Sequence, residues 1–356
     1  MYETVSLDDE RNALAIIDQT LLPAREELIF LTELEDIRDA IYHLKVRGAP
    51  AIGVAAAIGI YLEARAILNR MRVSRQPSTF DAFMTQFRAA KERLNSARPT
   101  AVNLSWALDR MERAAMAYKN KLLAAVVERL RAECLAIRDE DARVCAAIGH
   151  HGLELLKPGM GLLTHCNAGR LATASAYGTA TAPIYLGHER GYGFNVYCDE
   201  TRPLLQGARL TAYELCAAGI DATLLCDNMA PSLMASGRID AVLVGCDRVA
   251  ANGDTANKIG TSYVAIAAKH YGIPFYVCAP SSTVDFACAD GGSIEIEQRR
   301  PDEVTDMWYA QRMAPENIKV FNPSFDVTNA ALITAIITEF GIARPPYRES
   351  LATLIK

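Results

Sequence analysis

From residue 158 onward, short apolar runs alternate with helix-like patterns, and this alternation limits the chain to few folds. The runs predict strands over 161–166, 194–200, 222–227, 240–247, 274–280 and 318–323, and the segments between or after them predict helices over 171–182, 204–218, 228–236, 257–270 and 327–340. Strands that alternate with helices form βαβ units, which build a parallel sheet. Because the runs are continuously apolar, helices should cover both faces of the sheet. The sequence therefore predicts an α/β fold with a doubly wound, mostly parallel, Rossmann-like sheet.

The residues before this region have the pattern of a mainly helical domain. A helix is predicted over 34–46, where apolar residues recur at helical spacing. A second helix begins near Pro50, in whose first turn the missing proline N–H is not needed, and its alanine- and glycine-rich sequence permits close backbone packing. A chain of 356 residues is long enough for two domains. We expect a mainly helical domain over 1–127 and a Rossmann-like α/β domain over 128–356.

Composition argues against several classes of protein. The net charge of −5 without a basic cluster gives no footprint for nucleic acid. The N-terminus lacks the basic and apolar regions of a signal peptide, and no apolar run approaches the ~18 residues that span a bilayer. The nine cysteines contain no CxxC pair, which argues against a zinc site or a disulfide framework. We expect a cytoplasmic protein with reduced thiols, no nucleic acid partner and no membrane partner.

One cysteine lies where sheets of this kind bind ligands. Cys166 ends the first predicted strand, and Asn167, Ala168 and Gly169 follow before the next predicted helix. Ligands bind outside the carboxyl ends of the strands in an open α/β sheet, and a helix N-terminus there favours a thiolate or a phosphate. Cys166 is therefore either a reactive thiol or a small buried core residue, as free cysteines often are.

Polar residues also follow the next strands. They are Asp199, Glu200, Thr201 and Arg202 after the second strand, Asp227 and Asn228 after the third, and Asp247 and Arg248 after the fourth. A turn at 252–254 then leads to Asn257 and Lys258, which are expected to open a helix. Because the carboxyl ends of parallel strands share one edge, these residues should converge with Cys166 on one site.

Several side chains suit an anionic, hydroxylated ligand. The candidates are Arg47, Arg98 and Lys258 for an anion, and Gln206, Asn257 and Asn167 for hydroxyl groups. Arg47 precedes a helix together with the amides near Gly48 and Ala49, which fits either an anion site or a tight turn with a solvated arginine. Arg98 also precedes a helix, so it either binds phosphate or lies on the surface. Because no GxxxxGK[ST] motif and no GxGxxG after a strand occur, nucleotide binding of the usual kinds is not indicated.

His165 stands next to Cys166 and raises the question of a cysteine–histidine pair. Neighbouring residues on a strand point to opposite faces. We therefore expect His165 to be a structural donor behind the site rather than a catalytic base.

These motifs identify a resemblance that spans nearly the whole chain. The strings are RGAPAIG at 47–53, THCNAG at 164–169, DETRPLLQGARLTAYEL at 199–215, DNMA at 227–230, DRVAANGDTANKIGT at 247–261, FYVCAPSSTVD at 275–285 and VFNPSFDVT at 320–328. They closely resemble the methylthioribose-1-phosphate isomerase family. That family is related to the regulatory subunits of the eukaryotic translation-initiation guanine-nucleotide exchange factor, which are binding proteins.

The resemblance implies an aldose–ketose isomerisation in methionine salvage, from 5-methylthioribose 1-phosphate to 5-methylthioribulose 1-phosphate. It implies that Cys166 and Asp247 carry the catalysis. It implies substrate contacts at Arg47, Gly48, Ala49, Arg98, Gln206, Asn257 and Lys258. It also implies a homodimer with a sugar phosphate substrate, no metal and no organic cofactor.

The implied reaction poses a chemical problem, because the phosphate blocks the anomeric oxygen and the ring cannot open as a free hemiacetal does. Protonated Asp247 would donate to the ring oxygen. Cys166 would then assist hydrogen transfer between C2 and C1, either as a base through an enediol or by shaping a pocket for a hydride shift.

Two alternatives remain at this level. The substrate could be a related pentose phosphate, 5-deoxyribose 1-phosphate or ribose 1,5-bisphosphate, and Arg170 bears on this choice because the family more often has a small residue there. An inward Arg170 would favour a different 5-substituent, whereas an outward one has no consequence. The chain could also be a regulatory module that binds a phosphometabolite, but the presence of both Cys166 and Asp247 argues against that reading.

Overall fold

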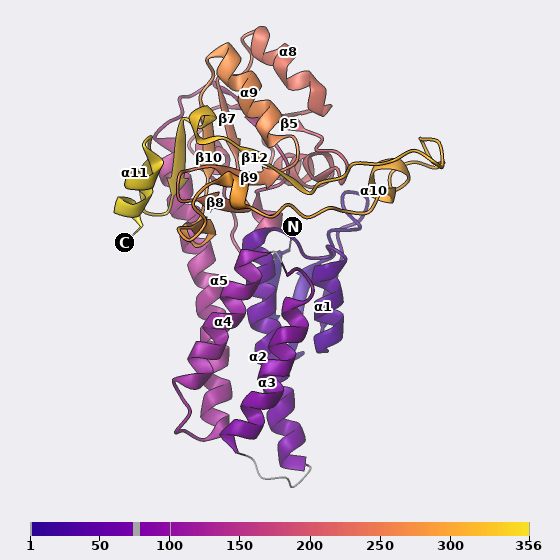
Figure 1. Cartoon of the computed structure of the whole chain (residues 1–356), viewed down its shortest axis with the longest axis vertical. Coiled ribbons are helices and arrows are strands. Elements are labelled where there is room, and N and C mark those ends of the chain that lie inside the picture. The colour runs from indigo at the N-terminus through magenta and orange to yellow at the C-terminus, as the bar shows by residue number, and fades with distance from the viewer. Residues whose placement is uncertain (1, 74–78, 100, 356) are drawn as a thin grey trace. The chain divides into compact units, whose positions relative to one another are not determined.

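The computed structural model describes residues 2–73, 79–99 and 101–355 (Figure 1). The chain divides into two compact units. Unit 1 contains the chain up to Arg143 together with Arg170–Ala176, and unit 2 contains Val144–Gly169 and the chain from Tyr177 onward. The division falls within helix α5 (Leu123–Leu153), which also contains the predicted domain boundary at 127/128.

Unit 1 begins with a small antiparallel sheet. Its strands are β1 (Val5–Asp8), β2 (Ala13–Ile17) and β3 (Leu28–Leu31), in the order β1-β2-β3. Every residue of the central strand β2 is buried. This strand therefore joins the small sheet to the apolar core of unit 1.

Helices make up most of unit 1, as predicted. They are α1 (Leu34–Tyr42), α2 (Ala49–Val73), α3 (Phe80–Asn95), α4 (Val102–Met116) and the first part of α5. Helix α2 is the central one, and two of its glycines allow close packing: a Cβ on Gly53 would lie 3.0 Å from the carbonyl oxygen of Asn103, and one on Gly59 would lie 3.0 Å from Ile37. The alanine- and glycine-rich sequence of α2 thus packs as expected.

Helix α2 corrects one expectation about apolar runs. By length and composition it could cross a membrane, although no run of that size was expected from the sequence. However, 83% of its apolar window is buried inside the protein. A helix that is apolar all round is also what a protein core requires, and α2 has that place in unit 1.

Unit 2 is built on a seven-stranded sheet in the order β14-β13-β10-β7-β4-β5-β6. The strands are β4 (Gly161–Thr164), β5 (Asn195–Asp199), β6 (Ala222–Leu225), β7 (Ala241–Val244), β10 (Phe275–Cys278), β13 (Ala335–Thr338) and β14 (Gly341–Ala343). All neighbours pair in parallel except β13 and β14. Because β4, β5, β6, β7 and β10 coincide with predicted runs, the predicted fold class is confirmed.

Helices cover both faces of this sheet. One apolar cluster joins α8 (Ala230–Ala235), α9 (Thr261–Tyr271) and α11 (Tyr347–Leu354) to the sheet, and another joins the end of α5, α6 (Ala182–Glu189) and α7 (Ala212–Ala217) to it. In β7, Val242 and Val244 belong to the first cluster, whereas Ala241 and Leu243 belong to the second. This alternation explains why β7 is apolar at every position.

Two predictions near the C-terminus are wrong. The described residues 318–323 form no strand, and the strand here is β12 (Phe325–Thr328). The predicted helix over 327–340 is a 3₁₀ turn at Ala330–Leu332 followed by β13. β13 is fully buried beside β10 and rich in β-branched residues, which favour strands. Periodicity alone does not separate such a short buried strand from a helix.

A second sheet carries the chain that follows β7. Its strand order is β11-β8-β9-β12, with β8 (Arg248–Ala250), β9 (Thr255–Lys258) and β11 (Val284–Asp285). The predicted turn at 252–254 closes the β8–β9 hairpin. Gly253 has a φ of +91°, and a Cβ there would lie 2.5 Å from the ring of Tyr347, so only glycine fits this turn.

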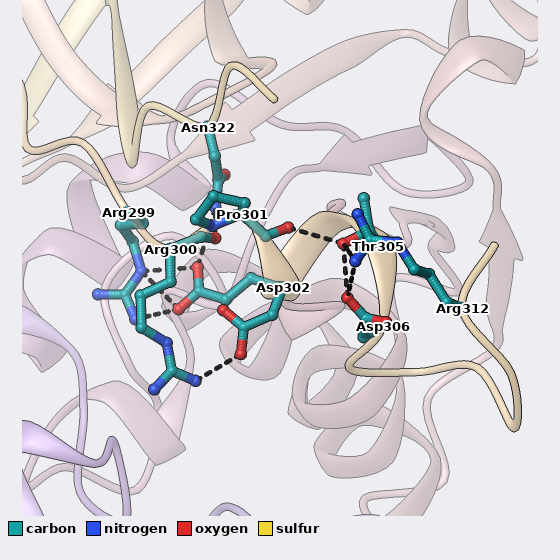
Figure 2. Close-up of polar contacts among 9 residues, drawn as sticks. Arg299, Arg300, Pro301, Asp302, Thr305, Asp306, Arg312 and Asn322 are labelled. Atoms are coloured by element: carbon teal, nitrogen blue, oxygen red, sulfur yellow. Dashed lines mark hydrogen bonds and ion pairs between the residues drawn. The ribbon is translucent and has the colours of Figure 1, made fainter. Parts of the chain in front are cut away.

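A long excursion joins β11 to β12 and contains the short helix α10 (Asp302–Thr305). Figure 2 shows polar contacts within it, among them the pair of Arg312 and Asp306 at 2.6 Å. Arg299 also pairs with buried Glu303. The Trp308 indole N–H also donates to the carbonyl oxygen of Pro203 at 2.7 Å. Ion pairs therefore contribute to ordering the excursion, and Trp308 ties it to the loop after β5.

The carboxylate of Asp254 joins three parts of unit 2 and generates a stability prediction. It accepts hydrogen bonds from the N–H groups of Ala330 (2.8 Å) and Gly291 (3.0 Å) and from the side-chain amide of Asn252 (2.9 Å). We expect Asp254→Ala to lower the free energy of unfolding of unit 2 by about 2–4 kcal/mol, because buried N–H groups lose a charged acceptor. A Trp106→Phe background leaves Trp308 as the one tryptophan of the two, so its fluorescence in urea reports on unit 2.

The same carboxylate sets the pH dependence of this effect. Burial alone would raise the pKa of Asp254, but the hydrogen bonds from Ala330, Asn252 and Gly291 outweigh it and hold the pKa below the ordinary 3.8. Its contribution is therefore complete above pH 3.8 and is lost as the pH falls through the lower folded pKa. The difference between parent and variant should be constant near neutral pH and shrink in acid. A variant as stable as its parent at neutral pH would contradict this role.

Candidate active site

The strand order of the main sheet reverses at β4. From β4 the chain steps through β5 to β6 on one side, then returns to β7 and continues through β10 to β13 on the other. The loops after the two central strands diverge at such a reversal, which is where open α/β sheets bind ligands. The loop after β4 carries Cys166 and the loop after β7 carries Asp247. The structure thus brings the loops of these two residues to the same point of the sheet.

These two loops touch each other. A Cβ added to Gly245 would lie 2.6 Å from the Cβ of Ala168, closer than two such atoms approach. Glycine at 245 therefore allows the Asp247 loop to reach the Cys166 loop. This role of Gly245 was not predicted, because nothing in the local sequence indicates which residue lies opposite it.

Cys166 is buried, with 8% of its surface exposed, and has a left-handed backbone with φ of 67°. Its N–H donates to Thr201 Oγ1 at 2.8 Å, and its carbonyl oxygen accepts from Thr211 Oγ1 at 2.7 Å. Thr201 was predicted only as part of a polar run after the second strand, and no role was predicted for Thr211. These partners are 35 and 45 residues away along the chain, so no local signal connects them to Cys166.

Asp247 precedes the β8–β9 hairpin and is half-buried. Its N–H donates to the carbonyl oxygen of Ala256 at 2.9 Å, which places it beside β9. Asn257 and Lys258 follow Ala256 in that strand. The prediction that these two residues open a helix is wrong, because β9 pairs with both β8 and β12 and α9 begins only at Thr261.

The other predicted substrate contacts of unit 2 are Asn257 and Lys258 in β9, and Gln206 in the loop after β5. Asn257 is 5% exposed and donates to Thr261 Oγ1 at 3.0 Å. Lys258 donates to the carbonyl oxygen of Ser324 at 3.1 Å, and its Nζ lies 4.5 Å from the centre of the Phe325 ring. The Lys258 ammonium group and the Asn257 amide therefore lie in β9, the strand that accepts the hydrogen bond from the Asp247 N–H.

Gln206 is the most informative of these contacts. It is 5% exposed, and its side-chain Oε1 has no hydrogen-bond partner among the described residues. A buried amide oxygen without a donor is costly, and native proteins rarely keep one without a reason. A hydroxyl group of a bound ligand would satisfy it. The prediction that Gln206 binds a hydroxyl therefore gains support from this geometry.

His165 lies behind the site. The side chain is 1% exposed; its Nδ1 lies 3.1 Å from Asp199 Oδ2 and its Nε2 lies 2.8 Å from the carbonyl oxygen of Ile259. Burial alone would lower the pKa of His165, but the Asp199 carboxyl raises it above the ordinary value. Both ring nitrogens are thus engaged with groups other than Cys166. This geometry fits a residue that joins β4, β5 and the turn before α9.

The chain that follows the Cys166 loop belongs to unit 1. Thr4 Oγ1 donates to the carbonyl oxygen of Arg170 at 2.8 Å, and Gln19 Nε2 donates to that of Leu171 at 2.7 Å. The N–H of Ala174 donates to Asp141 at 2.6 Å. The predicted helix over 171–182 is wrong: only a 3₁₀ turn forms at Arg170–Ala172, because partners from unit 1 take up the backbone groups that a helix would use.

Unit 1 also contains the remaining predicted contacts, Arg47, Gly48, Ala49 and Arg98. Gly48 has a φ of +91°, and a Cβ there would lie 2.5 Å from Ala172. Only glycine fits this turn. Helix α2 begins at Ala49, so the N–H groups of its first turn follow Arg47 directly. Arg98 stands in the turn before α4, where its carbonyl oxygen accepts from the N–H of Ala101 at 3.0 Å.

Comparisons with known proteins cover both units. A model of the initiation factor 2 subunit family (IF-2B) matches residues 45–345. A methylthioribose-1-phosphate isomerase of Symbiobacterium thermophilum is 62% identical over 354 residues, which are 99% of this chain and 96% of the relative. A 5-deoxyribose 1-phosphate isomerase of Petrotoga mobilis is 54% identical over 352 residues, which are 99% of each chain. The crystal structure of 5-methylthioribose 1-phosphate isomerase from Pyrococcus horikoshii has a TM-score of 0.90 at 39% identity and covers 99% of this chain and 96% of that one.

The contact between Gly245 and Ala168 generates a prediction in which a second substitution compensates for the first. We expect Gly245→Ala to lower the free energy of unfolding of unit 2 by about 1–3 kcal/mol, because the added methyl group overpacks the two loops. Adding Ala168→Gly removes the opposing methyl group and should recover most of the loss. Urea unfolding followed by Trp308 fluorescence measures both, with Ala168→Gly alone as the control. A double variant no more stable than Gly245→Ala would contradict the contact.

Proposed function

Because this chain belongs to the initiation factor 2 subunit family, we propose that it represents the isomerase branch of that family. The proposed reaction converts 5-methylthioribose 1-phosphate to 5-methylthioribulose 1-phosphate. The resemblance inferred from the motifs is confirmed by relatives that carry the isomerase name over nearly the whole chain. The observation that carries the proposal is the identity with the Symbiobacterium enzyme, which extends through both units. The reaction is an aldose–ketose isomerisation, a step of methionine salvage.

The proposed mechanism begins with ring opening. The phosphate on the anomeric oxygen prevents spontaneous opening, so the ring oxygen needs a proton as its bond to C1 breaks. We assign this donation to protonated Asp247. Its place after β7, at the reversal of strand order and beside the Cys166 loop, supports the assignment.

The second step moves hydrogen from C2 to C1. We assign Cys166 to this step, either as a thiolate base that takes the C2 proton and, as the thiol, returns it to C1 through an enediol, or as part of the pocket for a hydride shift. As the 2-hydroxyl becomes a carbonyl it loses a proton, which the Asp247 carboxylate can recover. Reaction in D₂O distinguishes the two routes, since only the enediol exchanges hydrogen with solvent.

The other residues are assigned to binding. Arg47, the amides of Gly48 and Ala49, and Arg98 are proposed to hold the phosphate, with Lys258 as a further cation. The amides of Gln206 and Asn257 are proposed to hold sugar hydroxyls. The start of α2 supports the phosphate assignment, because N–H groups at a helix N-terminus favour anions. The unsatisfied Oε1 of Gln206 supports the hydroxyl assignment.

A second substrate has specific support. The Petrotoga relative carries the name 5-deoxyribose 1-phosphate isomerase. The two pentose phosphates differ only in the 5-substituent, so the same ring opening and hydrogen transfer serve both. The side chain of Arg170 is half-buried and follows the Cys166 loop, which makes it a candidate for the choice between them.

We also propose a cytoplasmic homodimer that binds no nucleic acid. The family resemblance supports the homodimer. The cysteines support a reducing compartment, since all nine are described and none forms a disulfide. The net charge of −5 supports the absence of a nucleic acid partner.

Turnover by the purified protein tests the function directly. We expect conversion of 5-methylthioribose 1-phosphate, with 5-deoxyribose 1-phosphate and ribose 1,5-bisphosphate as competing substrates in the same assay. Cys166→Ser and Asp247→Asn should each lower kcat by roughly 10²–10⁴-fold, the usual contribution of acid–base groups. No turnover of any of the three by the folded parent would favour a regulatory binding protein. Parent-like turnover by both variants would rule out the mechanism.

The cations should act on binding instead. Arg98→Met and Lys258→Met are each expected to raise KM by roughly 10–100-fold with kcat little changed, because a charge-assisted phosphate contact acts on ground state and transition state alike. Arg88→Met is a matched control, since Arg88 is exposed and pairs with Glu112 within unit 1. Steady-state kinetics measures the effect, and an unchanged KM in both variants would remove these residues from the binding site.

A further inference from the structure

We propose that Thr201 and Thr211 are positioning residues for the Cys166 thiol, because their hydroxyl groups hold the Cys166 backbone from both sides in a left-handed conformation. The kinetic consequence of this inference rests on the proposed function, whereas its geometry does not.

The direction of each hydrogen bond is settled by its backbone partner. The N–H of Cys166 only donates and its carbonyl oxygen only accepts, so Thr201 Oγ1 accepts from the first (2.8 Å) and Thr211 Oγ1 donates to the second (2.7 Å). Thr201 gives its own proton to the carbonyl oxygen of Asp199 at 3.0 Å. Thr211 accepts from Asn167 Nδ2 at 3.1 Å. Each hydroxyl group is therefore both donor and acceptor, which fixes its rotation.

Cys166 needs such support. A φ of 67° is unfavourable for a residue with a Cβ and persists only where the surroundings impose it. Thr201 and Thr211 are both 0% exposed, so water cannot replace their hydroxyl groups. Thr201 itself has a φ of 65°. The Asp227 carboxylate holds it there by accepting the N–H groups of Thr201 and Arg202, each at 2.7 Å.

The left-handed turn decides where the thiol points. An extended continuation of β4 would send successive side chains to opposite faces, whereas the turn at Cys166 ends that alternation and gives its side chain a new direction. Thr211 reaches the turn from the end of a π-helical segment at Gly207–Thr211, a distortion that is frequent at functional sites. Small misplacements of a reacting group cost much in rate, about 10²-fold for 1 Å.

Paired substitutions separate the hydroxyl from the shape of each threonine. Valine keeps the shape and removes the hydroxyl group, whereas serine keeps the hydroxyl group. We expect Thr201→Val and Thr211→Val each to lower kcat by roughly 30–300-fold with KM within about threefold, because the phosphate and sugar contacts remain. The serine variants should keep kcat within about fivefold of the parent. A folded valine variant with parent-like kcat, or equal losses in valine and serine variants, overturns the proposal.

A second readout does not depend on turnover. Iodoacetamide labelling followed by mass spectrometry of peptides measures the reactivity of Cys166, with exposed Cys216 as an internal reference. Loss of either hydroxyl should raise the labelling rate of Cys166 by about fivefold or more and leave that of Cys216 unchanged, because a loosened turn exposes the thiol. If the parent converts no sugar phosphate, the proposed function fails. The ratio of the labelling rate of Cys166 to that of the reference cysteine still tests whether the two threonines position Cys166. An unchanged ratio overturns the positioning whatever the activity.

A further variant covers the case in which a valine variant does not fold. Asp227→Asn keeps the size of the side chain but replaces one acceptor oxygen with an amide donor that faces a backbone N–H. It should lower kcat at constant KM and raise Cys166 labelling, by less than the valine variants. A parent-like kcat together with parent-like labelling in Asp227→Asn overturns the proposal.

Discussion

The reversal of strand order at β4 is the constraint on which the site depends. Because the chain builds β5 and β6 on one side of β4 and β7, β10 and β13 on the other, the loops after β4 and β7 are neighbours although about 80 residues separate them. The contact of Gly245 with Ala168 sets how near these loops come. A side chain at position 245 would therefore first change the distance between the two loops, and any effect on the reacting groups would follow from that change.

Carboxylates that hold backbone N–H groups recur in the loops of unit 2. Asp227 accepts from the residues after β5, Asp326 from the start of α9, Asp240 from the first residue of β4, and Asp254 from two loops of unit 2. Irregular backbone between strands leaves N–H groups without ladder partners, and a buried N–H must be satisfied. Charged acceptors do this strongly and from a distance in sequence. The loops are thus held by groups that take no part in the proposed chemistry.

The sequence predicts those features that a single segment determines. The continuous apolar runs of β4 to β7 and β10, and the place of Cys166 and Asp247 at strand ends, follow from local pattern. Features that depend on partners elsewhere were missed: β13 was taken for a helix because its neighbour β10 lies far back in the chain, and residues 171–176 were taken for a helix because their backbone partners belong to unit 1. The threonines that hold Cys166 were missed for the same reason.

The residues that hold the main sheet together differ from those that we propose carry out the reaction. The sheet is held by two apolar clusters that draw on its strands and covering helices, and neither Cys166 nor Asp247 is a member of them. Residues on the loops at the carboxyl edge can therefore change while the sheet stays intact, so one fold can serve both catalysts and binding proteins. The hydroxyl groups of Thr201 and Thr211 hold the strained Cys166 backbone outside both apolar clusters. A strained backbone persists where the surroundings impose it, and here it sets the direction of the thiol that we propose takes part in the hydrogen transfer.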